Sequence, residues 1–174
     1  MKRDLYCGEI RKEHVGKNIT VCGWVSRRRD LGSLIFIELR DRSGLLQAVF
    51  NPQENEEAHR EAKRLRPEFV ACIQGRVVER STETVNKNLP TGEVEIAATK
   101  LTILNEARTP PFPIEDEVNV GDDLRLKYRY LDLRRPKMQK NLITRHKAVL
   151  AARTFLDSQG FLELETPMLT KSTP

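Results

Sequence analysis

The sequence predicts a five-stranded β-barrel with one helix between its third and fourth strands, followed by a proline-rich hinge and the opening of a second, α+β domain. Short apolar runs separated by turn residues fill the first 106 positions, which is typical of an all-β domain. A polar stretch with helix-capping residues interrupts these runs after the third of them. Three prolines within residues 109–113 then precede a long helical pattern.

The first two predicted strands form a hairpin. Residues 19–29 are rich in β-forming side chains and end in three arginines, and residues 30–33 supply turn chemistry before the strand at 34–41. Successive side chains of a strand point to opposite faces. This alternation assigns Ile35, Ile37 and Leu39 to the core. The opposite face of the same strand carries Leu34, Phe36, Glu38 and Arg40.

The remaining elements follow in order. Residues 45–50 form the third strand, and Asn51-Pro52 supplies a helix cap with proline at the first helical position, so we expect a helix from there to about Leu65. Its apolar stripe is thin, as in a surface helix. Two further strands are predicted at residues 69–80 and 94–104, with a polar loop between them that Pro90 and Gly92 punctuate.

This order of elements is that of the OB-fold, a small Greek-key barrel whose second and third strands present a face that binds oligonucleotides. An SH3-like barrel is the structural alternative, although it does not usually carry the helix. We therefore expect an OB-fold domain at 1–106, a hinge at 107–120 and the beginning of a larger domain at 121–174. The last part contains a predicted helix at 137–159, which Gly160 caps, and a short strand around Pro167 with no following layer.

Composition excludes several classes of protein. The 174 residues are 39% apolar and 32% charged with a formal charge of +5, which favours a folded, soluble and cytoplasmic protein. No apolar run approaches the roughly 18 residues that span a bilayer, so no membrane partner is expected. Three cysteines without CxxC spacing predict neither a disulfide framework nor a zinc site, and no metal site is expected.

Motifs for phosphate-loop, hydrolase and metalloprotease chemistry are absent from the sequence, so no catalytic residue is assigned. The informative feature is the polar side of the barrel. Phe36 is either a platform on which a base stacks or a ring covered by a loop or by the second domain. Arginines at 27–29, 76 and 80 can bind phosphates or base edges, and Gln47, Glu93 and Glu95 add groups that read unstacked bases.

The strings CGWVSRRRDLGSLIFIELRDRSGLLQ, LRLKYRYLDLRR and GFLELETPMLTKSTP closely resemble the N-terminal portion of bacterial-type aspartyl-tRNA synthetases. These are class II enzymes of the subgroup shared with the asparaginyl and lysyl enzymes. The resemblance covers essentially the whole chain. It identifies the segment from Gly160-Phe161 through Pro167 as class II motif 1, which belongs to the homodimer interface of the family.

The resemblance also implies roles for individual residues. Phe36 would stack on the central anticodon base of tRNA(Asp), and other residues would contact anticodon bases or phosphates, namely Arg27, Arg29, Gln47, Arg80 and Glu95. Leu31 and a residue near Thr84 would decide whether tRNA(Asn) is also accepted, and leucine rather than histidine at position 31 favours use of tRNA(Asp) alone.

The family forms aspartyl-adenylate from L-aspartate and ATP with Mg²⁺ and transfers aspartate to the 3′ end of the tRNA. Motifs 2 and 3, which carry those sites, are missing from the sequence. We therefore expect this chain to bind the anticodon loop without aminoacylating, and to need no cofactor of its own. The alternatives are a stand-alone OB-fold module for single-stranded nucleic acid, an asparaginyl or lysyl enzyme, and a purely structural dimerisation fragment.

Overall fold

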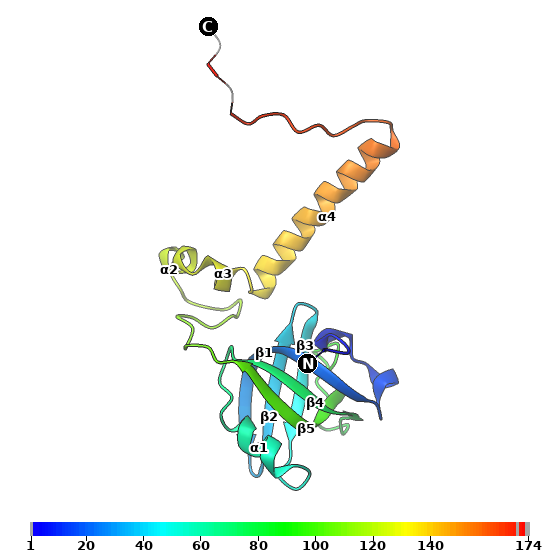
Figure 1. The fold of residues 1–174 in the computed structure, drawn as a ribbon, viewed down its shortest axis with the longest axis vertical. Coiled ribbons are helices and arrows are strands. Elements are labelled where there is room, and N and C mark those ends of the chain that lie inside the picture. Colours follow the sequence, from blue (N-terminus) through cyan, green and yellow to red (C-terminus); the bar gives the residue numbers. More distant parts are fainter. Residues whose placement is uncertain (1, 170, 173–174) are drawn as a thin grey trace. The chain divides into compact units, whose positions relative to one another are not determined.

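The computed structural model describes residues 2–169 and 171–172. Its internal contacts divide the chain into two compact units, Met1–Pro110 and Pro111–Pro174. The first unit is a barrel and the second is helical, with an extended C-terminal segment (Figure 1). The two units are described separately below.

The first unit is a closed barrel in the strand order β1-β2-β3-β5-β4. All neighbouring strands are antiparallel except β3 and β5, which are parallel. The strands are β1 (Asn18–Leu31), β2 (Leu34–Asp41), β3 (Gly44–Phe50), β4 (Val70–Glu79) and β5 (Val94–Asn105), with α1 (Glu56–Ala62) between β3 and β4. Two short 3₁₀ helices, η1 (Cys7–Glu9) and η2 (Lys12–His14), precede β1. The predicted OB-fold is confirmed, and the order of its elements excludes the SH3-like alternative.

The helix begins later than the sequence predicts. The side-chain oxygen of Asn55 accepts a hydrogen bond from the backbone N–H of Ala58 at 2.7 Å, so Asn55 is the N-cap of α1. The Asn51 side chain instead accepts from the N–H of Gln53, two residues later, which closes a local turn. Both residues are good caps. The competing turn explains why the predicted start at Asn51-Pro52 was wrong by about one helical turn.

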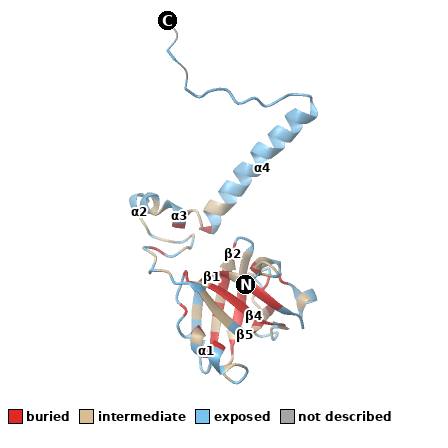
Figure 2. Cartoon of the chain, viewed as in Figure 1, coloured by how far each residue is buried: buried red, intermediate tan, exposed pale blue. Residues whose placement is uncertain are grey.

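Alternation along β2 is confirmed, since Ile35, Ile37 and Leu39 are buried in the barrel core (Figure 2). A bulge in β1 between Val25 and Arg27 shifts that strand's alternation by one residue. Beyond the bulge, Arg27 and Arg29 share the outer face of β1. The bulge therefore decides which arginines lie beside Phe36.

Two of the three cysteines form a disulfide. Cys22 on β1 and Cys72 on β4 are direct cross-strand partners, their Cα atoms are 4.2 Å apart and their sulfur atoms are bonded. The expectation that the sequence contains no disulfide is therefore wrong for this pair. Sequence spacing does not reveal the β1–β4 register, and the register is what brings the two residues together. Cys7 is buried and free.

The second unit contains α2 (Asp122–Lys127), α3 (Arg129–Asp132) and the 23-residue α4 (Pro136–Ser158). The predicted helix at 137–159 is confirmed within one residue, and Gly160 has a φ of 82°, the left-handed conformation of a helix C-cap. Residues 161–167 form no strand, contrary to the prediction. A strand requires a hydrogen-bonded neighbour, and in the part of the chain that the structure describes this segment pairs with none.

Candidate nucleic-acid interface

One face of the barrel gathers polar side chains around an aromatic ring. We call it the polar face and define it by residues from β1, β2, β3 and β5 and from the turn after β4. Strand register pairs Arg29 with Phe36 and Glu38 with Gln47, so the outward side chains of three neighbouring strands are adjacent. The members of the polar face are Arg27, Arg29, Phe36, Glu38, Gln47, Arg80 and Glu95.

Hydrogen bonds join the centre of the polar face into one network. A guanidinium nitrogen of Arg29, Nη2, donates to the side-chain oxygen of Gln47 at 3.1 Å and to Glu38 Oε1 at 3.2 Å. The amide nitrogen of Gln47 donates to Glu95 Oε2 at 2.7 Å. Gln47 is buried, with only 6% of its surface exposed. The oxygen and the nitrogen of its amide therefore both have hydrogen-bond partners, and the amide holds Arg29 and Glu95 in place.

Arg80 ends this network on the far side of Glu95. Its Nε lies 3.6 Å from Glu95 Oε2, within ion-pair range but beyond a hydrogen bond. The same Nε is buried and has no hydrogen-bond partner among the described residues. A buried donor without a partner costs about 1–3 kcal/mol. Among the described residues, the Arg80 Nε–H therefore has an ion-pair partner in Glu95 but no hydrogen-bond acceptor.

The Phe36 ring is half-buried, between the two extremes that the sequence left open. Its cross-strand neighbours are Arg29 on β1 and Val49 on β3. The Arg29 guanidinium is held by Glu38 and Gln47. An aromatic surface beside a fixed guanidinium suits the stacking of a base together with contacts to its edge or phosphate.

The remaining predicted residues lie at the margins of the polar face. Arg27 is exposed and pairs in register with Glu38, and Leu31, 59% exposed, ends the β1–β2 hairpin. Thr84 is exposed in the loop after β4, where its hydroxyl and backbone N–H both bond to Ser81.

The loop that carries Thr84 is fixed to the barrel. The buried Thr91 hydroxyl donates to the Leu45 carbonyl at the start of β3, at 2.6 Å. A side chain at Gly92 would place its Cβ 1.8 Å from the Asn86 carbonyl oxygen. Only glycine permits this close backbone approach, so the 81–92 loop keeps its path beside β3.

The structure also changes the list of functional residues. Arg28, grouped with its neighbours in the sequence interpretation, faces away from the polar face and bonds to Asp30 and to the chain after α1. Glu38 was assigned to the outer side of β2 but was given no contact role, and it is an acceptor for Arg29. Period-two alternation with Phe36 is the signal that would have identified it.

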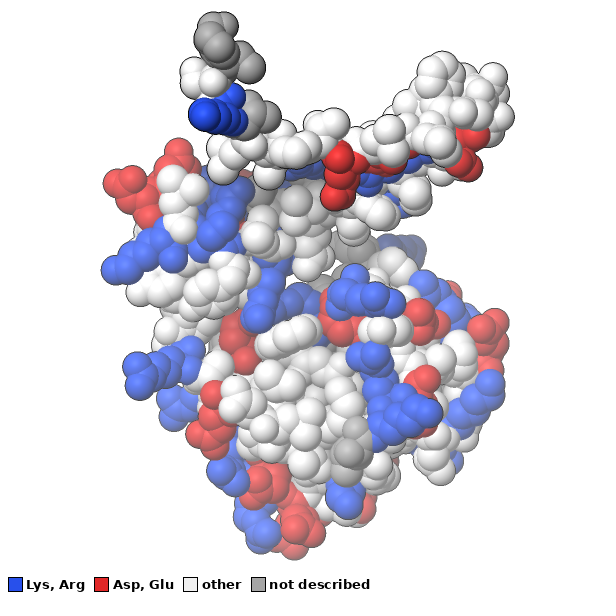
Figure 3. All heavy atoms as spheres, turned by 45° about the horizontal axis from the view of Figure 1, so that its top comes forward, with Lys and Arg blue, Asp and Glu red and all other residues white. Residues whose placement is uncertain are grey.

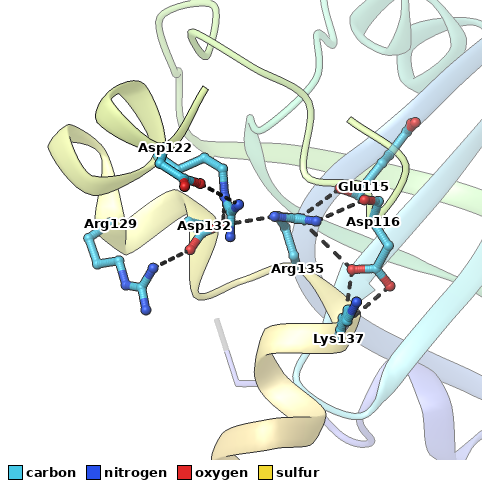
Figure 4. A network of polar contacts seen from close by, with 8 residues as sticks. Glu115, Asp116, Asp122, Arg129, Asp132, Arg135 and Lys137 are labelled. Atoms are coloured by element: carbon cyan, nitrogen blue, oxygen red, sulfur yellow. Dashed lines mark hydrogen bonds and ion pairs between the residues drawn. The ribbon is translucent and has the colours of Figure 1, made fainter. Parts of the chain in front are cut away.

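The second unit contains a separate ion-pair cluster around Asp132, which is fully buried (Figure 4). Asp132 accepts hydrogen bonds from Arg125 at 3.0 Å, Arg129 at 2.7 Å and Arg135 at 3.0 Å. Arg135 also donates to the backbone carbonyls of residues 115 and 116, so the cluster ties the segment before α2 to the start of α4. Burial alone raises the pKa of Asp132, but the hydrogen bonds from Arg125 and Arg135 outweigh it and hold that pKa below its usual value.

The predicted motif 1 residues Gly160, Phe161 and Pro167 follow α4, and Phe161 is 64% exposed. Most of α4 and of this segment is exposed (Figure 2), and many of the exposed residues are large and apolar. These residues belong to the second unit, whereas the polar face belongs to the first. An apolar surface of this kind is typical of a piece that packs against further protein.

No three or more His, Cys, Asp or Glu side chains among the described residues are grouped to hold a metal ion. No helix of the described chain has both the length and the apolar character needed to cross a bilayer.

Comparison with known proteins gives the same two parts. The family model for the OB-fold nucleic acid binding domain matches residues 19–104, and the model for class II tRNA synthetases (D, K and N) matches residues 121–174. Among solved structures, asparaginyl-tRNA synthetase from Pyrococcus horikoshii superposes with a TM-score of 0.83 at 28% identity, over 97% of this chain and 37% of that one.

Curated relatives are more similar in sequence. The aspartate–tRNA(Asp/Asn) ligases of Halothermothrix orenii and Symbiobacterium thermophilum are 55% and 57% identical over the whole chain, and the aspartate–tRNA ligase of Geobacillus kaustophilus is 55% identical. The chain spans about 30% of the length of each of these relatives. The chain therefore combines an OB-fold nucleic acid binding domain at residues 19–104 with a class II tRNA synthetase (D, K and N) segment at residues 121–174, and its curated relatives are aspartate–tRNA ligases.

Proposed function

We propose that the polar face binds the anticodon loop of tRNA(Asp). The observation that carries this proposal is the network from Glu38 through Arg29, Gln47 and Glu95 to Arg80, in which Arg29 is the cross-strand partner of the half-buried Phe36. Single-stranded RNA loops are recognised by stacking on such rings and by hydrogen bonds to the base edges. Proteins that bind double-stranded nucleic acid do not need an aromatic ring for this purpose, because the bases of a duplex are already stacked on one another.

The carboxylates allow the polar face to recognise bases, in addition to the phosphates that its arginines attract. A groove that only attracted phosphates would carry no acceptors, whereas Glu38 and Glu95 can accept from base amino and imino groups. Lys and Arg are interspersed with Asp and Glu on the surface that Figure 3 shows, so no broad field of one sign covers it. Recognition therefore depends on where Arg29, Arg80 and Phe36 are placed.

For the longer protein to which the chain corresponds, we infer the activity of the relatives. It would form aspartyl-adenylate from L-aspartate and ATP with Mg²⁺ and transfer aspartate to the 3′ end of the tRNA. It would act in the cytoplasm and form a homodimer through motif 1, which contains Gly160, Phe161 and Pro167. The described residues offer no cluster for Mg²⁺, so no step of the adenylation is assigned to them. We expect the 174-residue chain by itself to bind RNA without aminoacylating it.

Use of both tRNA(Asp) and tRNA(Asn) is the second candidate. It is favoured by the names of the relatives from Halothermothrix orenii and Symbiobacterium thermophilum, which print both tRNAs. Leu31, at the end of β1, and Thr84, in the loop after β4, are the residues expected to decide between the two. If Leu31 restricts the chain to tRNA(Asp), Leu31→His should raise affinity for a GUU stem-loop relative to a GUC stem-loop.

The proposed function is tested by titrating the chain with labelled anticodon stem-loops that carry GUC, GUU or UUU. We expect GUC to bind at least about 1 kcal/mol more tightly than UUU, the scale of one lost stacking or base-edge contact. Equal binding of all three loops would overturn the proposal and leave a nonspecific single-strand binding module. Tightest binding of UUU would instead indicate the lysyl enzyme, and tightest binding of GUU the asparaginyl enzyme.

A further inference from the structure

A second basic site lies on the barrel, outside the polar face. A cavity of about 380 Å³ opens where the chain after α1 passes the chain that leaves β5. All of its lining residues belong to the first unit. They are Arg28, Lys63, Arg66, Pro67, Ala107, Thr109 and Pro110.

The three cations of this cavity differ in what they contact. Arg28 is committed to protein acceptors, because it donates to both carboxylate oxygens of Asp30, to the Lys63 carbonyl, and to the Leu65 carbonyl at 3.4 Å. Lys63 and Arg66 are exposed, and their side chains have no hydrogen-bond or ion-pair partner among the described residues. Arg28 therefore positions the backbone that carries two uncommitted cations.

The charge of the cavity favours an anion. Asp30 pairs with Arg28 and also attracts Lys63 electrostatically, but no carboxylate is among the residues that line the cavity. Along the chain, Arg64 pairs with both Glu61 and Glu106, and these two carboxylates lie outside the lining of the cavity. The lining contains no aromatic ring on which a base can stack and no carboxylate or amide side chain that can read a base edge. A phosphate meets these conditions and a nucleobase does not.

We propose that this cavity binds a phosphodiester group of an RNA backbone, with Lys63 and Arg66 as the binding residues and Arg28 as the positioning residue. It is a sequence-independent contact, separate from recognition on the polar face. The proposal rests on RNA being the partner of the barrel, as proposed above, but it does not rest on which loop sequence is preferred. The phosphate can come from a stem or from a single strand, and the experiment distinguishes these sources.

The test compares the intact chain with the Lys63→Ala/Arg66→Ala variant in titrations of an RNA hairpin stem, a single-stranded heptanucleotide and inorganic phosphate. Lys17→Ala/Lys100→Ala is the charge-matched control, since both lysines are exposed and neither lines the cavity. Each lost phosphate contact lowers the slope of log K against log salt by about 0.7–0.9. We expect the cavity variant to lose roughly 5- to 20-fold in affinity near 0.15 M salt, with a slope smaller by about 1–2, and the control to change little.

The source of the bound phosphate is identified by which RNA loses affinity for the cavity variant. A loss confined to the hairpin stem assigns the cavity to duplex backbone, and a loss confined to the heptanucleotide assigns it to the single strand. Shifts of the backbone amide signals of residues 63–66 and 107–109 on adding RNA would support the site directly. Equal losses in the cavity variant and the control, without such shifts, would overturn it. Preference for the GUC loop is measured separately, so the proposed function and the phosphate site are tested independently of each other.

Discussion

The Gln47 side-chain nitrogen donates to Glu95 Oε2 at 2.7 Å across the parallel pair of β3 and β5. Since the Gln47 oxygen accepts from Arg29, a buried amide orients a cation on one side and a carboxylate on the other. The resemblance to synthetases assigned Gln47 to contact with bases or phosphates. Its position favours a role in which it fixes the two groups that reach the RNA.

Gln47→Glu tests this role. The new carboxylate would face Glu95 where a donor now stands, so we expect Glu95 to be displaced and the preference for the GUC loop to fall by about 1–3 kcal/mol, the cost of one lost buried partner. Stem-loop titrations of wild type and variant measure it. Gln74→Glu, the same change at a partly buried glutamine of β4 outside the network, is the control. An unchanged preference in Gln47→Glu would show that Gln47 does not orient the recognition groups.

Phe36→Ala removes the aromatic platform. We expect loop affinity to fall by about 1–3 kcal/mol, the usual value of base stacking on an aromatic ring. Because the ring is only half-buried, the loss of unfolding free energy should be smaller than the 3–5 kcal/mol typical of a core phenylalanine. Anisotropy titrations and urea unfolding followed by Trp24 fluorescence separate the two effects. A large loss of stability with unchanged affinity would make Phe36 a packing residue.

Asp41 links the N-terminal segment to the β2–β3 turn, and the link depends on pH. Its carboxylate accepts from the Cys7 N–H at 2.7 Å and from the Ser43 N–H and hydroxyl at 2.8 and 2.6 Å. Burial raises the pKa of Asp41, but these hydrogen bonds outweigh it and lower the pKa below its usual value. The folded state therefore binds this proton less readily than the unfolded state, and stability is lost as pH falls.

Asp41→Asn should accordingly destabilise the barrel near neutral pH by about 1–3 kcal/mol, the scale of hydrogen bonds to a charged group. The difference from wild type should narrow as pH falls below about 4, where the unfolded carboxyl of aspartate takes up a proton. Urea unfolding at a series of pH values measures both. Ser43→Ala, which removes one of the donors, should give a smaller version of the same pattern. A pH-independent difference would contradict the assignment.

Asp132→Asn leaves three arginines of the second unit around a neutral amide. We expect backbone hydrogen exchange to speed up in residues 115–137, which the cluster holds together, because a buried carboxylate has lost its charge. The barrel should exchange as in wild type. Arg125→Lys, which keeps the charge but loses the fork geometry, should give an intermediate effect. Unchanged protection in 115–137 would show that the ion pairs do not stabilise this unit.

Much of the fold follows from local chemistry. Alternation along β2 identified its core face, turn residues placed the hairpins, and Gly160 marked the end of α4. The start of α1 was misplaced because Asn51 and Asn55 are both acceptable caps, and only the turn closed by Asn51 decides between them. The expected strand near Pro167 failed because a strand's stability comes from a neighbour that sequence alternation cannot supply.

The sequence by itself therefore determined the order of the elements, the inward side chains of β2 and the residue types available for recognition, because these depend on local periodicity and turn chemistry. Only the tertiary structure decided the register. Register joins Cys22 to Cys72, places Gln47 between Arg29 and Glu95, and, through the bulge after Val25, puts Arg27 and Arg29 rather than Arg28 on the polar face. Contacts between strands far apart in sequence depend on pairings that no short stretch of residues specifies.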